Sequence, residues 1–318
     1  MKNSLPLLLD LERPRGNLIS GQVHKKELDK LLLKELRSGV VGEEQWYRND
    51  VLWHRLKSAP GNPYGNSGCD SEYDLVKRSS DKFSKLIRNY TQVFLGVGTG
   101  ESELEVVKAG LSTESYLEVI AVDVNREFIS DFAKMIRRKV ILDDCVVMFK
   151  GLNSLFQSLN EKSFQFCNKK NARNIFICFG NTVGNYVPQH LIFSIFEKIS
   201  NRGDRLFLGF QLNNNIEKIY KKYSDCALFF PFMTNFISKP DSSKVRWNLN
   251  KELTQIEAYY EKRIRRSRGF PKRTQLFRSR KYDSAKISKE LEPFGFKKIW
   301  EKIDDQEIAC IQIYERKS

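Results

Sequence analysis

A glycine-rich loop and a distant acid have the types and the spacing to bind a nucleoside. The loop Gly-Val-Gly-Thr-Gly occupies residues 96–100, directly after the apolar residues 91–95, and Asp123 ends a second apolar stretch, 23 residues after Gly100. Glycines let a backbone pass close to a ligand because they carry no Cβ, and an acid about 20 residues further on is expected to bind ribose hydroxyls. The residues predicted to bind such a ligand are Gly96, Val97, Gly98, Thr99 and Asp123.

The helix expected after this loop separates two classes of nucleoside cofactor. A glycine-rich loop followed by an acid fits both nicotinamide enzymes and S-adenosylmethionine (SAM) enzymes. A dinucleotide needs a helix N-terminus that accepts a pyrophosphate, and Glu101, Glu103 and Glu105 would repel that group. SAM carries no phosphate, so the pattern favours SAM; the remaining alternative is a glycine turn that serves packing alone.

A second polar loop supplies candidates for substrate binding. The apolar residues 174–179 lead into the turn Gly-Asn-Thr-Val-Gly-Asn-Tyr at 180–186, and a helix and a further apolar strand follow. In open α/β sheets, ligands bind at the carboxyl ends of strands. An amide can accept a hydrogen bond from an amine and donate one to a carboxylate, which makes Asn185 the leading candidate, while its alternative role is that of a turn residue. Gly180, which opens the turn, is predicted to border the cofactor.

Strand and helix patterns alternate from residue 90 to residue 211. This alternation predicts a parallel sheet with helices on both faces. Before it, residues 1–90 indicate helices and irregular structure. After it, residues 212–250 are expected to form a long connection that contains one helix.

The last hundred residues complete two structural units. Residues 253–265 and 274–282 have the pattern of a strand hairpin, and a helix and two more strands follow. We therefore expect an α/β fold with a Rossmann-like sheet and a smaller α+β domain that binds the substrate. The first unit is predicted to comprise residues 85–212 and 284–318, and the second residues 1–84 and 213–283.

Composition excludes several classes of protein. The 318 residues are 41% hydrophobic and 29% charged, as in ordinary globular proteins, and no apolar run approaches the roughly 18 residues of a membrane span. The six cysteines form no CxxC pair, which favours reduced thiols and a cytoplasmic location. The three histidines lack ligand-like neighbours, so we expect no metal site. Because no apolar run is long enough to span a membrane, we also expect no membrane partner. The sequence indicates no oligomeric state.

The net charge of +15 is concentrated in one segment. Residues 262–281 hold ten lysines and arginines and no acid. Such a stripe is the electrostatic footprint of a nucleic-acid binder, but it is also compatible with a solvated face. The second interpretation is favoured because Phe270 and Phe277 are the only aromatic residues there, and bases need aromatic side chains on which to stack.

Both loops resemble one family of SAM enzymes. Residues 95–101 (LGVGTGE) match the glycine loop of the SAM-dependent histidine Nα-methyltransferase family, which makes amino-acid betaines, and residues 179–185 (FGNTVGN) match its FLG-x-TIGN turn. The resemblance implies a class I SAM methyltransferase sheet. It also implies that Asn185 and Tyr223 act at the catalytic centre, where they hold the amino group and the carboxylate of the substrate. By the same resemblance Tyr73 lies at the pocket entrance, and Ser279 belongs to a strand that contacts the substrate side chain.

Three positions depart from the family pattern. Phe277 replaces the glutamate that binds an imidazole, which argues against histidine as the substrate and favours an amine with a neutral side chain. The family's adenine-binding Gly-Asp-Phe falls on Lys150-Gly151-Leu152, where Gly151 and Leu152 are predicted to cover the adenine and a short helix to begin. The family's Lys-Thr after the glycine loop is replaced by Ser102-Glu103.

The predicted function is therefore SAM-dependent N-methylation of an amino acid or a related small molecule. Methyl transfer from a sulfonium to an amine depends mainly on alignment of the reacting atoms, and no general base is evident in the sequence. Two alternatives remain. The chain could be an RNA methyltransferase or nucleic-acid-binding protein that uses residues 262–281, or it could bind SAM without catalysis.

Overall fold

The structure, a computed structural model, describes residues 19–20, 25–59, 63, 70–140, 145–164, 173–186, 190–262 and 271–317. The strands are β1 (Ile19–Ser20), β2 (Tyr90–Leu95), β3 (Tyr116–Asp123), β4 (Val146–Asn153), β5 (Arg173–Cys178), β6 (Arg205–Gln211), β7 (Val245–Asn250), β8 (Gln255–Tyr260), β9 (Thr274–Arg280), β10 (Phe296–Ile303) and β11 (Ala309–Arg316).

The α-helices are α1 (Lys25–Ser38), α2 (Asp50–Ser58), α3 (Asp70–Ile87), α4 (Glu101–Leu111), α5 (Arg126–Lys139), α6 (His190–Ile199), α7 (Ile216–Asp225), α8 (Phe229–Met233) and α9 (Ser284–Leu291). Short 3-10 helices are η1 (Glu43–Arg48), η2 (Phe156–Ser158), η3 (Glu161–Phe164), η4 (Thr182–Gly184), η5 (Ser242–Lys244) and η6 (Glu292–Phe294).

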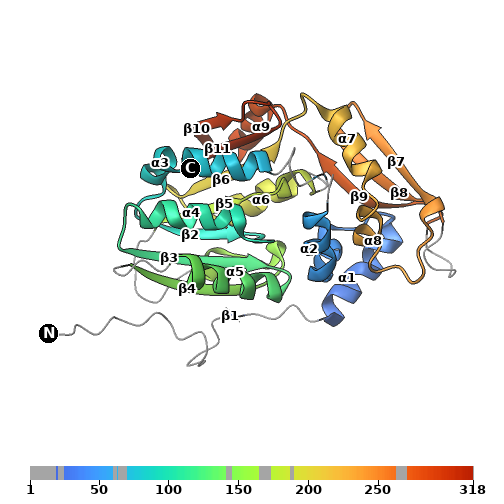
Figure 1. The fold of residues 1–318 in the computed structure, drawn as a ribbon, viewed down its shortest axis with the longest axis horizontal. Coiled ribbons are helices and arrows are strands. Elements are labelled where there is room, and N and C mark those ends of the chain that lie inside the picture. The colour runs from blue at the N-terminus through green and yellow to red at the C-terminus, as the bar shows by residue number, and fades with distance from the viewer. Residues whose placement is uncertain are drawn as a thin grey trace.

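The main sheet has the strand order β1-β4-β3-β2-β5-β6-β11-β10 (Figure 1). Neighbours from β1 to β6 are parallel, and β11 is antiparallel to both β6 and β10. Apart from the two-residue β1, this is the Rossmann-like sheet that the sequence predicts, and that part of the expected fold is confirmed. A separate domain that binds the substrate stays a prediction. The strand order reverses between β2 and β5, so the carboxyl ends of β2, β3 and β5 border the crevice where such sheets bind ligands.

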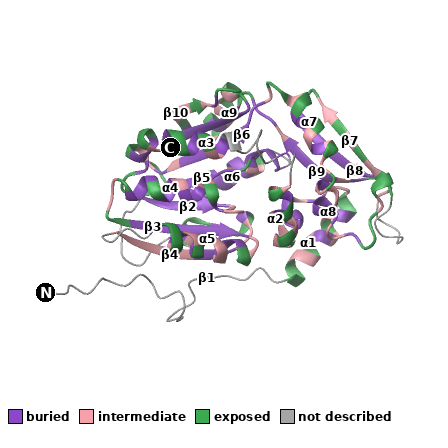
Figure 2. Cartoon of the chain, viewed as in Figure 1, coloured by how far each residue is buried: buried purple, intermediate pink, exposed green. Residues whose placement is uncertain are grey.

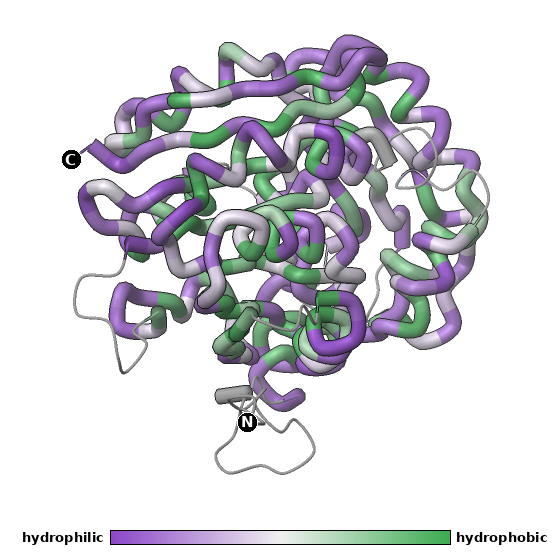
Figure 3. Tube along the Cα trace, turned by 60° about the vertical axis from the view of Figure 1, so that its left-hand side comes forward, coloured by the Kyte–Doolittle hydropathy of each residue, from purple (hydrophilic) through white to green (hydrophobic). Residues whose placement is uncertain are grey.

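Helices cover both faces of this sheet because its strands are apolar on both sides. Phe94 of β2 belongs to a core with α3, α4 and α5, whereas its neighbours Val93 and Leu95 pack into a core with α6 and α9. Figure 2 shows the central strands buried along their length, and in Figure 3 hydrophilic residues gather on the outer turns. A strand that is buried on both faces reads as a continuous apolar run, which is why the sequence identifies it.

A second sheet lies beside the carboxyl ends of the main strands. Its order is β7-β8-β9, all antiparallel, and α1, α2, α7 and α8 lie around it (Figure 1). Aromatic residues of this unit join the same core as α3 and α4. The bridge between Leu212 and Tyr282 connects its end to the main sheet.

Two expectations about the elements were wrong. Residues 245–250 form strand β7 and not a connection, since Val245, Trp247 and Leu249 alternate with more exposed polar residues. No helix begins at residue 151, because Gly151 and Leu152 continue β4 in register with Ala121 and Val122 of β3. The turn predicted between the hairpin strands, and much of the basic segment, lie at 263–270, outside the described residues.

Candidate active site

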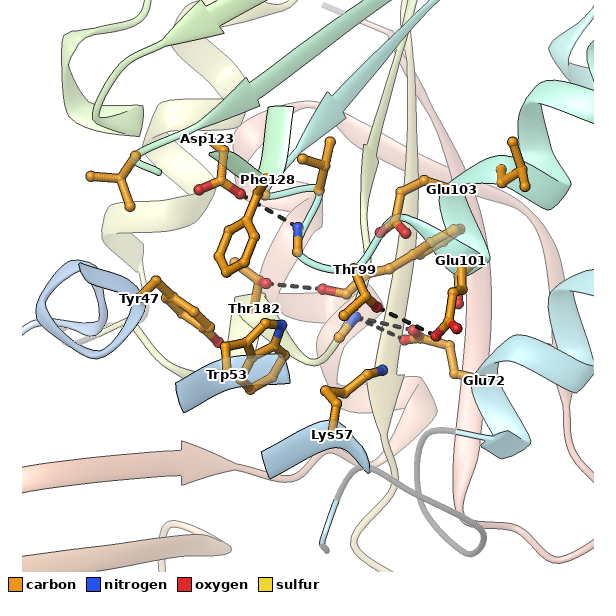
Figure 4. Close-up of a pocket in the computed structure, with 18 of the residues that line it drawn as sticks. Tyr47, Trp53, Lys57, Glu72, Thr99, Glu101, Glu103, Asp123, Phe128 and Thr182 are labelled. Atoms are coloured by element: carbon orange, nitrogen blue, oxygen red, sulfur yellow. Dashed lines mark hydrogen bonds between the residues drawn. The ribbon is translucent and has the colours of Figure 1, made fainter. Parts of the chain in front are cut away.

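The described residues form a cavity of about 390 Å³ at the carboxyl ends of β2, β3 and β5. The loops after these strands make one wall, and η1 and α2 make the wall opposite. Figure 4 shows Asp123 and Phe128 toward one end, the acids Glu72, Glu101 and Glu103 toward the other, and Trp53 and Lys57 facing them from α2. The cavity therefore has an end that suits a nucleoside and an end that suits charged groups.

The glycine loop approaches the cavity with a backbone that side chains rarely allow. Gly96, Gly98 and Gly100 have φ angles of 79°, 47° and 75°. A Cβ on Gly100 would lie 2.6 Å from a ring carbon of Phe132, so that position also has no room for a side chain. The predicted cofactor residues Gly96, Val97, Gly98 and Thr99 all line the cavity, as does Gly180.

Asp123 lies at the end of β3 with its carboxylate at the cavity wall. The Asn125 N–H donates to Oδ1 at 2.8 Å, and the Gly98 N–H approaches Oδ2 at 3.5 Å. Burial raises the pKa of this carboxyl to about 6, so at neutral pH it is mainly ionised and can accept hydrogen bonds. These features fit a carboxylate that receives the two ribose hydroxyls of SAM.

The loop after β4, and not the strand itself, lines the cavity where the adenine is expected. Among the described residues, Gly151 and Leu152 do not line the cavity, because they pair inside the sheet. Ser154, Leu155 and Phe156 line it instead, opposite Val124 and Phe128. The apolar cover predicted for the adenine ring is therefore available two to four residues later in the chain.

Glu72 fixes the loop after β5 at the charged end of the cavity. Both of its carboxylate oxygens accept from the Gly180 N–H at 3.1 Å. A Cβ on Gly209 would lie 2.3 Å from Glu72 Oε2, so the glycine in β6 makes this approach possible. Burial raises the pKa of Glu72 to about 7 and that of Glu103 to about 8, while the nearby Lys57 acts in the opposite direction.

These charges suit the amino-acid part of SAM. Its α-ammonium group and sulfonium would face the carboxylates of Glu72 and Glu103, and its carboxylate would face the Lys57 ammonium group. The lost lysine of the glycine loop has a replacement in Lys57, which comes from α2 across the cavity. The residues present thus fit SAM at both ends.

Two buried acids from η1, Glu43 and Glu44, also line the cavity, and the sequence analysis does not predict them. Glu43 and Glu44 are 6% and 8% exposed. Asn185 and Tyr186 hydrogen-bond the Glu43 carboxylate, and Gln157 Nε2 donates to Glu44 Oε1 at 2.8 Å. Burial, reinforced by the charge of Glu44, raises the pKa of Glu43 to about 8.

The predicted substrate residues divide into two groups. Tyr73 lines the cavity. Asn185 is not among the described residues that line it; its side chain is 3% exposed and hydrogen-bonds Glu43, which does line it. Tyr223 and Phe277 are fully buried in an aromatic cluster, where the Phe277 ring centroid lies 4.9 Å from that of Trp46. Neither of these two lines the cavity formed by the described residues, and their contact with substrate stays a prediction.

Ser279 takes part in a buried hydrogen-bond network. Its hydroxyl accepts from Asn181 Nδ2 at 3.0 Å and from Lys281 Nζ at 2.9 Å. Asn181 also donates to the Arg280 carbonyl and accepts from the Gln211 N–H at 3.0 Å, so it connects the turn to β9 and β6. The role of Ser279 in reading a substrate side chain also stays a prediction.

The sequence carried a signal for some of the missed residues. Glu72 directly precedes Tyr73, which the family resemblance places at the pocket entrance. Trp53 and Lys57 are four residues apart, which places them on one side of a helix. The sequence contains no comparable signal for Glu43 and Glu44, because a short 3-10 helix has no long periodic pattern.

Two kinds of feature are absent from the part of the chain that the structure describes. No group of three or more histidine, cysteine, aspartate or glutamate side chains is arranged there to hold a metal ion. In the same ranges, no helix combines the length and the apolar character needed to cross a bilayer.

Comparison with known proteins agrees with this site. A family model described as histidine-specific, SAM-dependent methyltransferases matches residues 68–275. A comparison with curated proteins gives no match. Similar solved structures include magnesium protoporphyrin IX methyltransferase from Synechocystis PCC 6803 with bound S-adenosylhomocysteine (SAH), at 12% identity and a TM-score of 0.47, over 84% of this chain and 93% of that chain.

Another similar structure is the 1,6-didemethyltoxoflavin-N1-methyltransferase from Burkholderia thailandensis, at 9% identity and a TM-score of 0.45, over 87% of this chain and 92% of that chain. The family model covers well over half of the chain, and it includes the glycine loop, Asp123 and the turn after β5. The chain is therefore a SAM-dependent methyltransferase, and it belongs to the histidine-specific methyltransferase family.

Proposed function

We propose that the protein transfers the methyl group of SAM to the amine of an amino acid or a related small molecule. The observation that carries the proposal is the position of Glu43 and Glu44, two buried carboxylates in the same cavity as the glycine loop. SAM supplies an electrophilic methyl group on a sulfonium. Carboxylates beside that group suit an acceptor that arrives as an ammonium ion.

The residues of the chain align the acceptor and keep water away. Tyr47 and Trp53 pack edge to face at 5.1 Å, Phe156 and Tyr186 stack at 6.3 Å, and all four rings belong to residues that line the cavity. An aromatic wall favours a small organic acceptor and, where it excludes water, strengthens the electrostatic interactions inside. The unit around the second sheet, which supplies η1 and α2, is on this proposal the substrate side.

Histidine is not the proposed acceptor. The position that binds an imidazole in the related enzymes is Phe277, and its ring lies against Trp46 and Phe229 at centroid distances of 4.9 and 4.7 Å. An imidazole placed there would displace aromatic packing and gain no acidic partner.

An assay of SAM consumption against amino acids, biogenic amines and RNA tests the proposal. We expect SAH to form with at least one amine and the methyl group to be found on nitrogen by mass spectrometry. RNA should give no SAH and no salt-dependent gel shift. SAH binding in calorimetry without turnover of any amine would instead support a SAM-binding protein without catalysis and would contradict the proposal.

A further inference from the structure

The cavity is acidic although the protein is basic. The whole chain carries a net charge of +15. The residues that line the cavity nevertheless include seven carboxyl groups, against three lysines and no arginine. A cleft lined mainly by one sign of charge favours ligands of the opposite sign, so this cavity favours cations.

Two of the three lysines lie at the outer edge of the cavity. Lys108 of α4 is exposed, and its Nζ contacts Glu105 Oε1 at 2.7 Å. Lys139, also exposed, is the last residue of α5. The third, Lys57, is the cation that acts on both Glu72 and Glu103. At the end of the cavity where these two acids meet, carboxyl groups therefore outnumber cations.

Glu72 and Glu103 can still accept hydrogen bonds and positive charge. They come from α3 and α4, line the cavity, and are 6% and 7% exposed. The two oxygens of Glu72 share one donor, the Gly180 N–H, and a carboxylate has about four acceptor positions. The Glu103 carboxylate accepts from its own backbone N–H, and no second residue among those described donates to it.

The surroundings of these two acids make them respond to a nearby charge. Burial raises the pKa of Glu103 to about 8, and the charges of Glu72 and Glu101 add to this effect, while Lys57 opposes it. Cys178 of β5 also faces both acids, and their charges raise its pKa. A cation that enters the cavity would lower the pKa of both carboxyl groups and favour their ionised form.

We propose that Glu72 and Glu103 make the cofactor site selective for the charged methyl donor, so that SAM binds more tightly than its product SAH. The two molecules share the adenosine, the α-ammonium group and the carboxylate. They differ in one methyl group and in the positive charge that this group leaves on sulfur. Largely buried carboxylates can detect that difference, because solvent and salt screen them little.

Methyl transfer itself would then weaken the binding of the cofactor. It removes the charge from sulfur while both acids stay in place, so SAH is released readily and inhibits the enzyme only weakly. This inference concerns the cofactor and does not depend on which amine accepts the methyl group.

Dissociation constants of SAM and SAH, measured by calorimetry at pH 7.5, test the selectivity. In the wild type, the constant for SAH should exceed that for SAM by about tenfold or more, as expected for one charge in a site of low exposure. SAH binding that is as tight as SAM binding would overturn the proposal. Failure to methylate any amine would leave it standing, and equal affinities would leave the proposed function standing.

The variants Glu103→Gln and Glu72→Gln test the two residues. Each keeps the shape of the side chain and removes its charge, so the ratio of the two constants should fall by at least about threefold. The affinity for SAH should stay within about threefold, which shows that the site is folded. Glu105→Gln, in the same helix as Glu103, is the control and should keep the wild-type ratio, since Glu105 is paired with Lys108. An unchanged ratio in Glu103→Gln would overturn its role.

Proton release gives a second and independent measurement. Because SAM favours the ionised acids, its binding should release more protons than the binding of SAH, and its advantage over SAH should grow from pH 6 to pH 7.5. Calorimetry in phosphate and in Tris buffer, which differ in ionisation enthalpy, counts these protons. Equal proton release by the two ligands would overturn the proposal even if the variants fail to fold.

Discussion

Two asparagines in the turn after β5 have different surroundings and should behave differently when replaced. Asn185 holds the Glu43 carboxylate beside the cavity, whereas Asn181 bonds Ser279, Arg280 and Gln211 inside the protein. Asn181 also has a φ of 60°, which asparagine tolerates better than most residues. The sequence pattern alone does not distinguish the two.

Asn185→Ala should lower kcat/KM by more than roughly tenfold, because Glu43 and the acceptor lose a positioning contact. Asn181→Ala is the matched variant, and it should lower the free energy of unfolding by about 2–4 kcal/mol through lost buried hydrogen bonds. Initial rates and denaturant titrations measure the two effects. Wild-type turnover in Asn185→Ala would contradict the role given to that residue.

The residues of the site that the sequence predicted are those with local signals. Gly96 to Thr99 and Asp123 follow apolar strands and were identified by spacing. Phe277 was expected near substrate, but Trp46, more than 200 residues earlier, covers its ring. Glu43 reaches the cavity only through packing of η1 against the turn after β5, and no short-range pattern encodes such contacts.

Helix α2 is the element through which the second unit reaches the cofactor. Its N-cap is Asn49, whose side chain accepts from the Leu52 N–H at 3.1 Å, and it directs Trp53 and Lys57 into the cavity. A Cβ on Gly98 would lie 3.6 Å from Trp53 Nε1, so the helix packs directly over the glycine loop. We therefore expect the affinity for the cofactor to depend on the position of α2.

Lys57→Met should weaken SAH binding by roughly tenfold, as loss of one charged hydrogen bond does. Its affinity for 5′-methylthioadenosine, which lacks the amino-acid part, should stay unchanged. Arg55→Met, on the exposed side of the same helix, is the control and should bind both ligands normally. Equal weakening of both ligands in Lys57→Met, measured by calorimetry, would show that Lys57 does not face the carboxylate.

How well the sequence predicts a strand depends on how that strand is buried in the fold. Strands β2, β3 and β5 are buried on both faces and read as apolar runs, so the sequence predicts a parallel sheet with helices on both faces. Strand β7 shows weaker alternation and was missed, although Val245, Trp247 and Leu249 carry the two-residue period. The end of β4 was placed too early because Gly151 resembles a turn residue, while its pairing with β3 continues to Asn153.

On the scale of the whole molecule, the cavity concentrates carboxyl groups that burial keeps partly protonated. The pKa values of Glu43, Glu72 and Glu103 are raised to about 8, 7 and 8. Each favours the folded state below the unfolded pKa near 4.5, and this contribution is lost as pH rises through the folded value.

The melting temperature of the free enzyme should therefore fall between pH 6 and pH 9. The fall in melting temperature should be smaller in the Glu43→Gln variant. It should also be smaller in the wild-type enzyme bound to SAM, because SAM brings positive charge to the acids. Thermal denaturation at both pH values measures this. A melting temperature that rises with pH, or an equal fall in the variant, would contradict the assigned environment of Glu43.

The central claim is geometric: the donor lies across the ends of β2, β3 and β5 with its methyl group directed toward Glu43. A crystal structure of the enzyme with SAH measures it directly. We predict ribose hydroxyls on Asp123 and a distance of roughly 6–7 Å from the SAH sulfur to the Glu43 carboxylate, enough for one amine nitrogen and its methyl group. SAH bound elsewhere, or a sulfur separated from Glu43 by protein side chains, would contradict it.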